Sequence, residues 1–400
     1  MTITRAPASS TDAMALLTGT GAGDLIRTVL RPHGADAARW RVTEVASQRR
    51  GIRVRYDVEV VWPDGRRSHE MLAAATGTIP EGAAVLEDGP DRIAVWGHPF
   101  DPELPALPAA SSPEAVACLL EELGISKGPV ELRHRAYRPT RRAVIEAIGP
   151  RGRLFLKVVR PDRVESIHRI HRVLVEHDVP VAPSLGWTPD GLLVVQALPG
   201  STMREHLLGD RPGLPTGQTV VELLGRFPDE LLQLPAAPTW LDRVGHYAGV
   251  TARALPDQRG RLESLVAEIT DQAQVGPMVP VHGDLYDSQL LVGAGRITGL
   301  LDVDTMRPGD RTEDLACLLG HLSVLAALHP HRGAAIRALG ARYLEHFDGV
   351  VPPADLRWRT AAVVVSLTTG PHRVQQANWE RATRSLVELA RRWAQSAART

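Results

Sequence analysis

The chain has 400 residues, more than one small hydrophobic core requires, which indicates two or three domains. Its 46 basic and 46 acidic residues cancel, which argues against a general nucleic-acid binder because such proteins carry a basic excess. The sequence has no apolar run approaching the ~20 residues of a membrane-spanning helix. We therefore expect a cytoplasmic globular protein whose partners include neither nucleic acid nor a membrane.

The N-terminal stretch MTITRAPASSTDAMALLTGTG has one arginine and only a short apolar patch. We therefore expect a frayed leader followed by a helix and not a signal peptide. Cys118 and Cys317 are far apart and show no metal-ligand spacing. We expect both to be reduced and buried, as is usual for cytosolic thiols. His321 lies in no organised ligand pattern either and is expected to be an ordinary residue.

Residues 40–100 carry strand patterns. In the stretch VRYDVEVVW, the apolar residues from Val54 to Val60 alternate with charged ones, which is the period of a half-buried strand. A proline-rich connector is expected over residues 98–113. Ser112 and Pro113 are then the N-cap and the first residue of a helix.

From Val130 the pattern becomes three strands, a helix and two further strands, and after Gly200 it is mostly helical. We therefore predict an α+β protein with three parts. These are a β-rich N-terminal cap region at 1–110, a small lobe at 111–200 and a helical lobe at 201–400.

Lysine is rare in this chain, since all the basic residues except Lys127 and Lys157 are arginine. Lys157 lies within the apolar strand RLFLKVVR. A lysine in that position is either a side chain that reaches solvent along its aliphatic stem or a cation retained for chemistry. Its scarcity and position favour the second interpretation.

The stretch VHGDLYDSQLLVGAGRITGLLDVD, from Val281 to Asp304, has the spacing of a phosphoryl-transfer centre. Such a centre needs a carboxylate beside the acceptor hydroxyl, and an amide oxygen and a second carboxylate to bind Mg²⁺. In protein kinases the amide residue follows the first carboxylate by five positions. Here Gln289 follows Asp284 by that spacing, and a predicted hairpin turning at 293–295 returns Asp302 beside the loop.

These motifs resemble the aminoglycoside phosphotransferase family, which has a bilobal protein-kinase-like fold and uses ATP and Mg²⁺. The matching motifs are His282-Gly283-Asp284, Asp302, Gly309-Asp310, Asp314-Leu315-Ala316 and the interlobe segment LLVVQALPG. The resemblance implies Asp284 as the catalytic base, Gln289 and Asp302 as the Mg²⁺ ligands and Lys157 as the phosphate-binding cation. It further implies that the backbone of Gln196 and Leu198 pairs with adenine. The chain departs from the family in lacking a glycine-rich loop over the phosphates, and we expect Arg138 and Arg142 of the first hairpin to contact the phosphates instead.

For several other residues, the sequence is compatible with two different roles. His282 is expected to brace the loop by family resemblance, the alternative being a general base. Asp287 and Asp310 are either solvated loop acids or ligands, and Asp304 could reach metal or substrate. The helix glutamate that would pair with Lys157 is not evident, because Glu165 comes early and Glu176 late, with His168 and His171 between them.

The acceptor is suggested by three features. Gln289 replaces the family's usual Asn, as it does in the similar bacterial maltokinases and glucosamine kinases, whose N-terminal cap the β-rich region also resembles. Residues 201–400 hold 22 acids and 21 arginines, so they lack the acidic excess expected for polycationic aminoglycosides. Trp379 and Glu380 are suited to bind an amino sugar, the alternative being core packing and a helix N-terminal acid.

The sequence therefore predicts an ATP-dependent kinase for a sugar or amino-sugar hydroxyl, with glucosamine-type acceptors favoured. The alternatives are an antibiotic phosphotransferase and a catalytically inactive ATP-binding scaffold. The oligomeric state does not follow from the sequence.

Overall fold

The computed structural model describes residues 10–19, 21–47, 51–88, 91–272, 274 and 276–400. The chain forms two compact units. Unit 1 comprises residues 1–165, 185–196 and 373–377, and unit 2 comprises residues 166–184, 197–372 and 378–400. Among the described residues, no helix combines the length and the apolarity that a membrane crossing demands.

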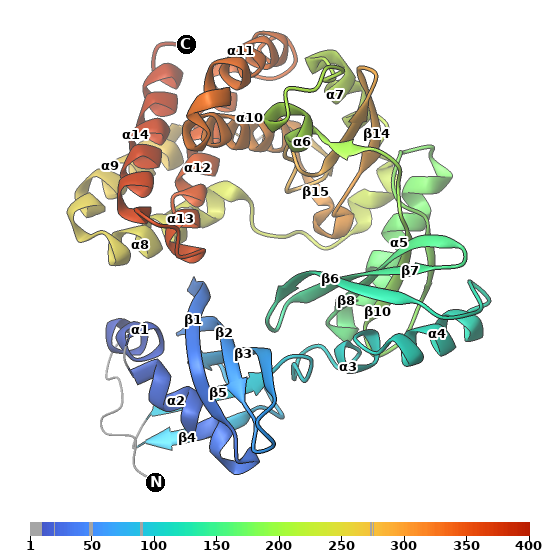
Figure 1. Ribbon diagram of the computed structural model, residues 1–400. Coiled ribbons are helices and arrows are strands. Elements are labelled where there is room, and N and C mark those ends of the chain that lie inside the picture. Colours follow the sequence, from blue (N-terminus) through green and yellow to red (C-terminus); the bar gives the residue numbers. More distant parts are fainter. Residues whose placement is uncertain (1–9, 20, 48–50, 89–90, 273, 275) are drawn as a thin grey trace. The chain divides into compact units, whose positions relative to one another are not determined.

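Unit 1 contains two five-stranded antiparallel sheets (Figure 1). The first has the strand order β1-β2-β3-β5-β4, and short helices pack on it. Its elements are α1 (Ser10–Thr18), α2 (Gly21–Leu30), η1 (Arg31–His33), β1 (Asp36–Ser47), β2 (Ile52–Val61), β3 (Arg67–Thr76), β4 (Ala84–Asp88) and β5 (Asp91–Gly97). The alternation predicted for β2 is confirmed, since Val54, Tyr56, Val58 and Val60 are all buried.

The second sheet of unit 1 has the order β6-β7-β8-β10-β9. Its elements are α3 (Leu107–Ala110), α4 (Pro113–Glu122), β6 (Glu131–Arg138), β7 (Arg142–Gly149), β8 (Gly152–Val159), β9 (Ser184–Trp187) and β10 (Leu192–Gln196). Ser112 caps α4 as predicted, because its side chain accepts a hydrogen bond from Ala115 N. The connector before it is packed, with Leu104 and Leu107 fully buried under this sheet.

Unit 2 is mostly helical and also holds two small sheets, β11-β13-β14 and β12-β15. Helix α5 (Pro161–Glu176) crosses the division between the units. The strands and 3₁₀ turns are β11 (Ser201–Thr202), η2 (Asp229–Gln233), η3 (Pro256–Gln258), β12 (Met278–Val281), β13 (Leu290–Gly293), β14 (Arg296–Leu300), η4 (Val303–Thr305) and β15 (Arg307–Asp310). The α-helices are α6 (Met203–Leu208), α7 (Gly217–Leu224), α8 (Trp240–Ala254), α9 (Arg259–Gln272), α10 (Arg311–Leu328), α11 (Pro330–Phe347), α12 (Pro353–Leu367), α13 (Gly370–Arg373) and α14 (Trp379–Ala397).

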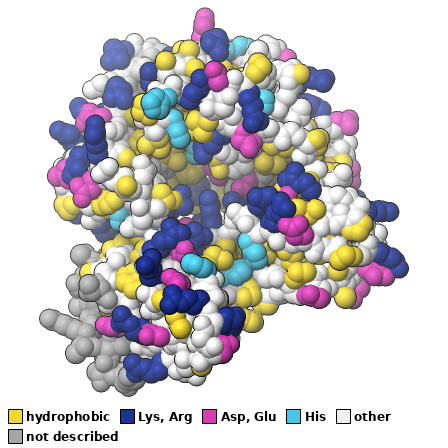
Figure 2. Space-filling model, in the orientation of Figure 1, with side chains coloured by type: hydrophobic (Ala, Val, Ile, Leu, Met, Phe, Trp, Pro, Cys, Tyr) yellow, Lys and Arg dark blue, Asp and Glu magenta, His cyan; other side chains and the backbone are white. Residues whose placement is uncertain are grey.

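The predicted α+β class is confirmed, with strands dominating unit 1 and helices unit 2. The chain runs from the second five-stranded sheet of unit 1 through the segment after β10 into the helical unit 2, which holds the β12–β13 loop and the β13–β14 hairpin. This is the order expected for a protein-kinase-like fold. The finer division at residues 110 and 200 stays a prediction. On the face drawn in Figure 2, basic and acidic side chains are interspersed, as the balanced composition suggests.

Helix α12 is buried on every side from Asp355 to Ser366, which places it in the core of unit 2. Arg359, one of its two buried arginines, donates to Asp355 at 2.7 Å, to Asp310 at 3.0 Å and to the Gln274 carbonyl. This network connects α12 to the start of α10. Because both carboxylates are buried, each relies on the guanidinium for compensation of its charge.

We predict that Arg359→Met destabilises the protein by about 3–5 kcal/mol, because it leaves two buried carboxylates without their cation. Urea unfolding followed by circular dichroism measures the change. The exposed pair Arg384–Asp257 offers a matched control, and we expect Arg384→Ala to leave the unfolding midpoint close to that of the wild type, because solvent screens an exposed ion pair. Equal unfolding midpoints for the two variants would contradict a role for the buried network.

Candidate active site

A buried carboxylate anchors the loop between β12 and β13. Asp314, in the first turn of α10, is fully buried and accepts hydrogen bonds from His282 N and Gly283 N, both at 2.8 Å. Burial raises the pKa of this carboxyl, and the two amide donors act against that rise. Asp314 thus sets the backbone path just before Asp284.

Gly283 is required at its position for two reasons. Its φ is +79°, in the left-handed region that side chains disfavour. A Cβ atom there would also lie 2.7 Å from the Thr305 carbonyl oxygen. The loop therefore passes closer to η4 than any residue with a side chain would permit.

His282 uses both ring nitrogens within the loop. Its Nε2 donates to the Leu301 carbonyl at 2.9 Å, and its Nδ1 accepts from Asp284 N at 3.3 Å. This pattern fits a neutral ring with the proton on Nε2. The ring is fully buried, so His282 braces Asp284 against the end of β14, and the alternative of a general base does not fit this geometry.

Gln289 and Asp302 lie together on the hairpin that follows the loop. Gln289 Nε2 lies 3.4 Å from Asp302 Oδ2. The backbone of Gln289 is fixed by bonds to Tyr286 O and from Leu301 N, both 2.8 Å. Asp302 has a φ of +57°, a conformation that aspartate tolerates better than most residues. It is the N-cap residue of η4, which contains Asp304.

The separation of these two side chains suits a magnesium ion. Oxygen ligands at 2.0–2.1 Å from Mg²⁺ in adjacent octahedral positions lie roughly 2.9 Å apart. A half-turn of the Gln289 amide would put its oxygen where the nitrogen now lies, 3.4 Å from the Asp302 carboxylate. An amide oxygen and a carboxylate are the ligand types that Mg²⁺ prefers, so the donor set fits the ion.

Asp287 and Asp310 are not solvated loop acids. Asp287 is fully buried and forms a two-bond ion pair with Arg204 at 2.6 and 3.3 Å. Asp310 is also buried, caps α10 through Thr312 N and accepts from Arg359. The sequence alone does not distinguish these roles from solvated or ligand carboxylates, because the charged partners Arg204 and Arg359 lie far away along the chain.

Cys317 and His321 are brought beside Asp284. One ligand atom from each of these three side chains lies within 4.8 Å of the other two. The His321 ring stacks on Tyr286, with centroids 4.3 Å apart, and burial lowers its pKa to about 4. Burial also raises the pKa of the Cys317 thiol, with Asp284 acting in the same direction. Cys317 is a free, buried thiol, as predicted. His321, which belongs to no organised ligand pattern along the chain, lies beside Asp284 and Cys317 in the structure. The spacing of four between Cys317 and His321 along one helix was the signal that could have found them.

Lys157 and the two hairpin arginines belong to unit 1. Lys157 lies in β8, is 9% exposed and pairs in register with Val144 and Leu193 on the neighbouring strands. Arg138 and Arg142 face each other across the β6–β7 hairpin. Gln196 is the exposed last residue of β10, and Leu198 follows it in unit 2, half-buried.

The tip of the β6–β7 hairpin is held by residues that precede the second sheet. Asp101 Oδ2 accepts from Thr140 N at 2.7 Å and from the Tyr137 hydroxyl at 2.8 Å. Arg53 of the first sheet donates to Thr140 Oγ1 at 2.5 Å. Thr140 has a φ of +59°, which is unusual for a β-branched residue. These bonds hold the turn between Arg138 and Arg142 in a fixed shape.

The remaining sequence candidates occupy other elements. Trp379 is the first residue of α14 and is half-buried. Its ring packs edge-on against the His372 ring, with centroids 4.6 Å apart. Glu380 is exposed and lies 3.5 Å from Arg384. On α5, His168 contacts Ser184 and His171 donates to the Ala182 carbonyl, while Glu165 and Glu176 are exposed.

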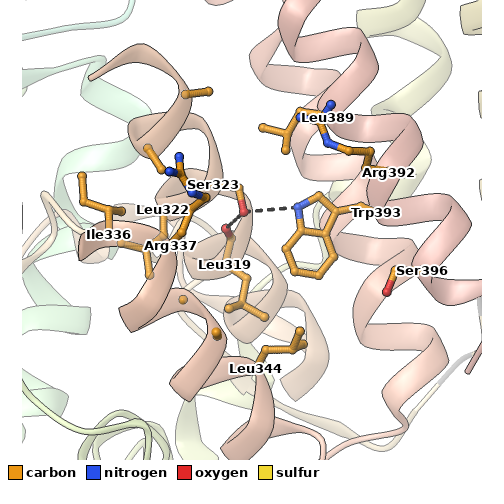
Figure 3. Close-up of a pocket in the computed structure, with 14 residues that line it drawn as sticks. Leu319, Leu322, Ser323, Ile336, Arg337, Leu344, Leu389, Arg392, Trp393 and Ser396 are labelled. Carbon is orange, nitrogen blue, oxygen red and sulfur yellow. Dashed lines mark hydrogen bonds between the residues drawn. The ribbon is translucent and has the colours of Figure 1, made fainter. Parts of the chain in front are cut away.

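A cavity of about 470 Å³ lies elsewhere in unit 2, among α10, α11 and α14 (Figure 3). Trp393 donates to Ser323 Oγ at 3.2 Å in its wall. At 100° per residue, its α10 lining lies on the opposite side of that helix from Cys317 and His321. That lining is Leu319, Leu322, Ser323, Ala326 and Ala327. The cavity is thus separate from the Asp284 loop.

Comparison with known proteins places this site in a family. Residues 140–360, more than half of the chain, match the model described as the phosphotransferase enzyme family. A search of curated proteins found no significant match.

Solved structures with similarity to the chain include three phosphotransferases. Macrolide 2'-phosphotransferase MphH from Brachybacterium faecium is 20% identical, with 68% of this chain and 98% of that chain covered and a TM-score of 0.41. A thermostable aminoglycoside phosphotransferase APH(4)-Ia mutant with ADP and hygromycin B is 13% identical, with 70% and 97% covered and a TM-score of 0.49. Aminoglycoside phosphotransferase APH(3'')-Id from Streptomyces rimosus is 19% identical, with 63% and 98% covered and a TM-score of 0.40.

We predict that Asp314→Ala loosens the loop before Asp284, because two buried amide donors lose their acceptor at about 1–3 kcal/mol each. Hydrogen exchange measured by NMR should show faster exchange at the His282 and Gly283 amides. The Leu319 amide, inside α10, is the internal control and should stay protected. Unchanged exchange at all three amides would rule out Asp314 as the loop's anchor.

Proposed function

Because the chain belongs to the phosphotransferase enzyme family, we propose that it transfers the γ-phosphoryl group of ATP to a hydroxyl of a sugar or amino sugar, with glucosamine-type acceptors favoured. The observation that carries the proposal is the arrangement on one loop and hairpin. Asp284 is braced by His282, and Gln289 lies 3.4 Å from Asp302 immediately after it. A cytoplasmic location, where ATP is available, is part of the proposal.

In this proposal Asp284 is the base. Its carboxylate accepts the proton of the acceptor hydroxyl as the oxygen attacks phosphorus and the β–γ bridging bond breaks. Two sets of hydrogen bonds keep that carboxylate oriented. The Asp284 backbone amide donates to the His282 ring, and Asp314 accepts from the two preceding backbone amides. Such positioning is what a reaction of this kind requires from the protein.

Gln289 and Asp302 would hold Mg²⁺, which when bound neutralises charge on the β- and γ-phosphate oxygens. Lys157 would contact the α- and β-phosphates, and Arg138 and Arg142 would contact the phosphates from the hairpin tip. The backbone at Gln196 and Leu198 would pair with adenine. The rigid shape of the hairpin tip, fixed by Asp101 and Arg53, supports this use of arginines in place of a glycine-rich loop.

The choice of a sugar or amino sugar as acceptor rests on individual residues and on the N-terminal sheet. Gln289 is shared with the sugar kinases that resemble this family. Unit 1 also carries an additional five-stranded sheet at its N-terminal end, in the β-rich region that resembles their cap. Asp304 lies two residues after Asp302, where a carboxylate can hold a sugar hydroxyl or an ammonium group. Trp379 and Glu380 are further candidates, since indole faces stack on sugar rings.

The proposal is tested by ATP turnover against a panel of glucosamine, other hexoses, maltose, aminoglycosides and macrolides in the presence of Mg²⁺. We expect turnover with a sugar or amino sugar. Turnover with antibiotics alone would make the protein a resistance enzyme. Nucleotide binding without turnover of any acceptor would favour an inactive scaffold.

We predict that Asp284→Asn lowers kcat by about 10²–10⁴-fold, because the amide cannot take up the proton of the acceptor. The same rate assay with the best acceptor measures it. Asp271→Asn, which removes an exposed carboxylate on α9, is the matched control and should leave kcat unchanged. A variant at 284 with wild-type turnover would exclude that residue as the base.

We predict that Gln289→Leu raises the Mg²⁺ concentration for half-maximal activity by about 10–100-fold, because it removes an oxygen ligand. Gln289→Asn retains the amide oxygen on a shorter side chain and should fall between that variant and the wild type. Titration of Mg²⁺ at fixed ATP measures both. If leucine leaves the Mg²⁺ requirement unaltered, Gln289 is not a ligand.

A further inference from the structure

We propose that Asp284, Cys317 and His321 form a second cation site, selective for Zn²⁺ over Mg²⁺, whose occupation inhibits the enzyme. The basis is geometric. A carboxylate oxygen of Asp284, the Sγ of Cys317 and a ring nitrogen of His321 all lie within 4.8 Å of one another. The proposed Mg²⁺ ligands, Gln289 and Asp302, are different residues, so the two sites share no ligand.

The three side chains are brought together by well-fixed elements. Cys317 and His321 lie four residues apart and therefore share one face of α10. A capping box at Asp310 fixes the start of α10. In the first turn of this helix, Asp314 accepts a hydrogen bond from the backbone of the β12–β13 loop. The separations among the three ligand atoms thus follow from the same contacts that hold the catalytic loop.

The ligand types favour zinc. Zn²⁺ binds thiolate sulfur at about 2.3 Å and imidazole nitrogen or carboxylate oxygen at about 2.0–2.2 Å, so its tetrahedral ligands lie roughly 3.3–3.7 Å apart. The observed cluster would close by about 1 Å to reach those separations. Three protein ligands leave a fourth position for water. Mg²⁺ prefers oxygen ligands alone and would not select a thiol and an imidazole.

The surroundings favour a dication as well. Cys317 lies in the field of Asp284, Asp314 and Asp287, and negative charge in a buried region attracts a divalent ion. Formation of the zinc–sulfur bond releases the thiol proton to solvent, so each ion bound displaces one proton. The Tyr286 ring, stacked on His321, keeps the imidazole plane oriented.

The inhibitory consequence rests on the proposed function, whereas the binding does not. A zinc ion on the Asp284 carboxylate would occupy the oxygen that accepts the hydroxyl proton. Transfer would then fail even with ATP and Mg²⁺ bound. Cobalt binding therefore tests the site by itself, and zinc inhibition tests its effect on catalysis.

The binding test uses Co²⁺ as a spectroscopic probe, because a cobalt–thiolate bond gives charge-transfer absorption in the near ultraviolet. We expect one equivalent of Co²⁺ to produce this band in the full-length wild type, and Zn²⁺ to abolish it. The chain's other cysteine is the control. Cys118 is exposed and lies in unit 1, so the predicted burial of that residue is wrong. Cys118→Ser should retain the band, and folded Cys317→Ser should lack it.

No band in the Cys118→Ser protein, whose single thiol is Cys317, would overturn the site, and this result does not depend on whether Cys317→Ser folds. A band that survives in folded Cys317→Ser would overturn it too. His321→Gln should weaken Co²⁺ binding by about 10–100-fold, and unchanged affinity would remove His321 from the ligand set.

The activity test measures transfer to the best acceptor at saturating Mg²⁺ with increasing Zn²⁺. We expect wild type and Cys118→Ser to be inhibited alike, and Cys317→Ser to need about 10–100-fold more Zn²⁺ relative to its own zinc-free rate. Inhibition equal in all three would overturn the regulatory part. A cobalt band in a protein with no turnover of any acceptor would instead reject the proposed function and leave the metal site standing.

Discussion

The buried carboxylate of Asp314 is the constraint on which the rest of the site depends. It accepts from two consecutive backbone amides, His282 and Gly283, and so ties the loop to the first turn of α10. A carboxylate with no solvent exposure is stable only because those donors surround it. Through this one side chain, the position of the helix sets the position of Asp284.

The helix start is in turn fixed by a second set of buried charges. Asp310 caps α10 and accepts from Arg359, while Glu313 pairs with the buried Arg307. Removing charges from water is costly, and here each is compensated by a partner of opposite sign. The acidic residues of this region therefore divide into structural ones, such as Asp310 and Asp287, and the candidates for chemistry, Asp284 and Asp302.

Much of the fold and part of the site could be predicted because the signals are local. The alternation in β2, the Ser112 cap and the hairpin between Leu290 and Leu300 all depend on neighbouring residues. The distance from Gln289 to Asp302 follows from that hairpin. Contacts such as Arg204 with Asp287, separated by 83 residues, carry no local signal and could not be predicted in this way.

By itself, the sequence determined the α+β class, the Lys157 strand and the order of Asp284, Gln289 and Asp302, because spacing and periodicity are properties of short segments. Only the tertiary structure decided that Asp287 is a buried ion-pair member, that Cys118 is exposed and that Cys317 and His321 lie beside Asp284. Burial and long-range pairing arise from how helices, strands and loops pack within each unit. A residue's neighbours along the chain do not specify them.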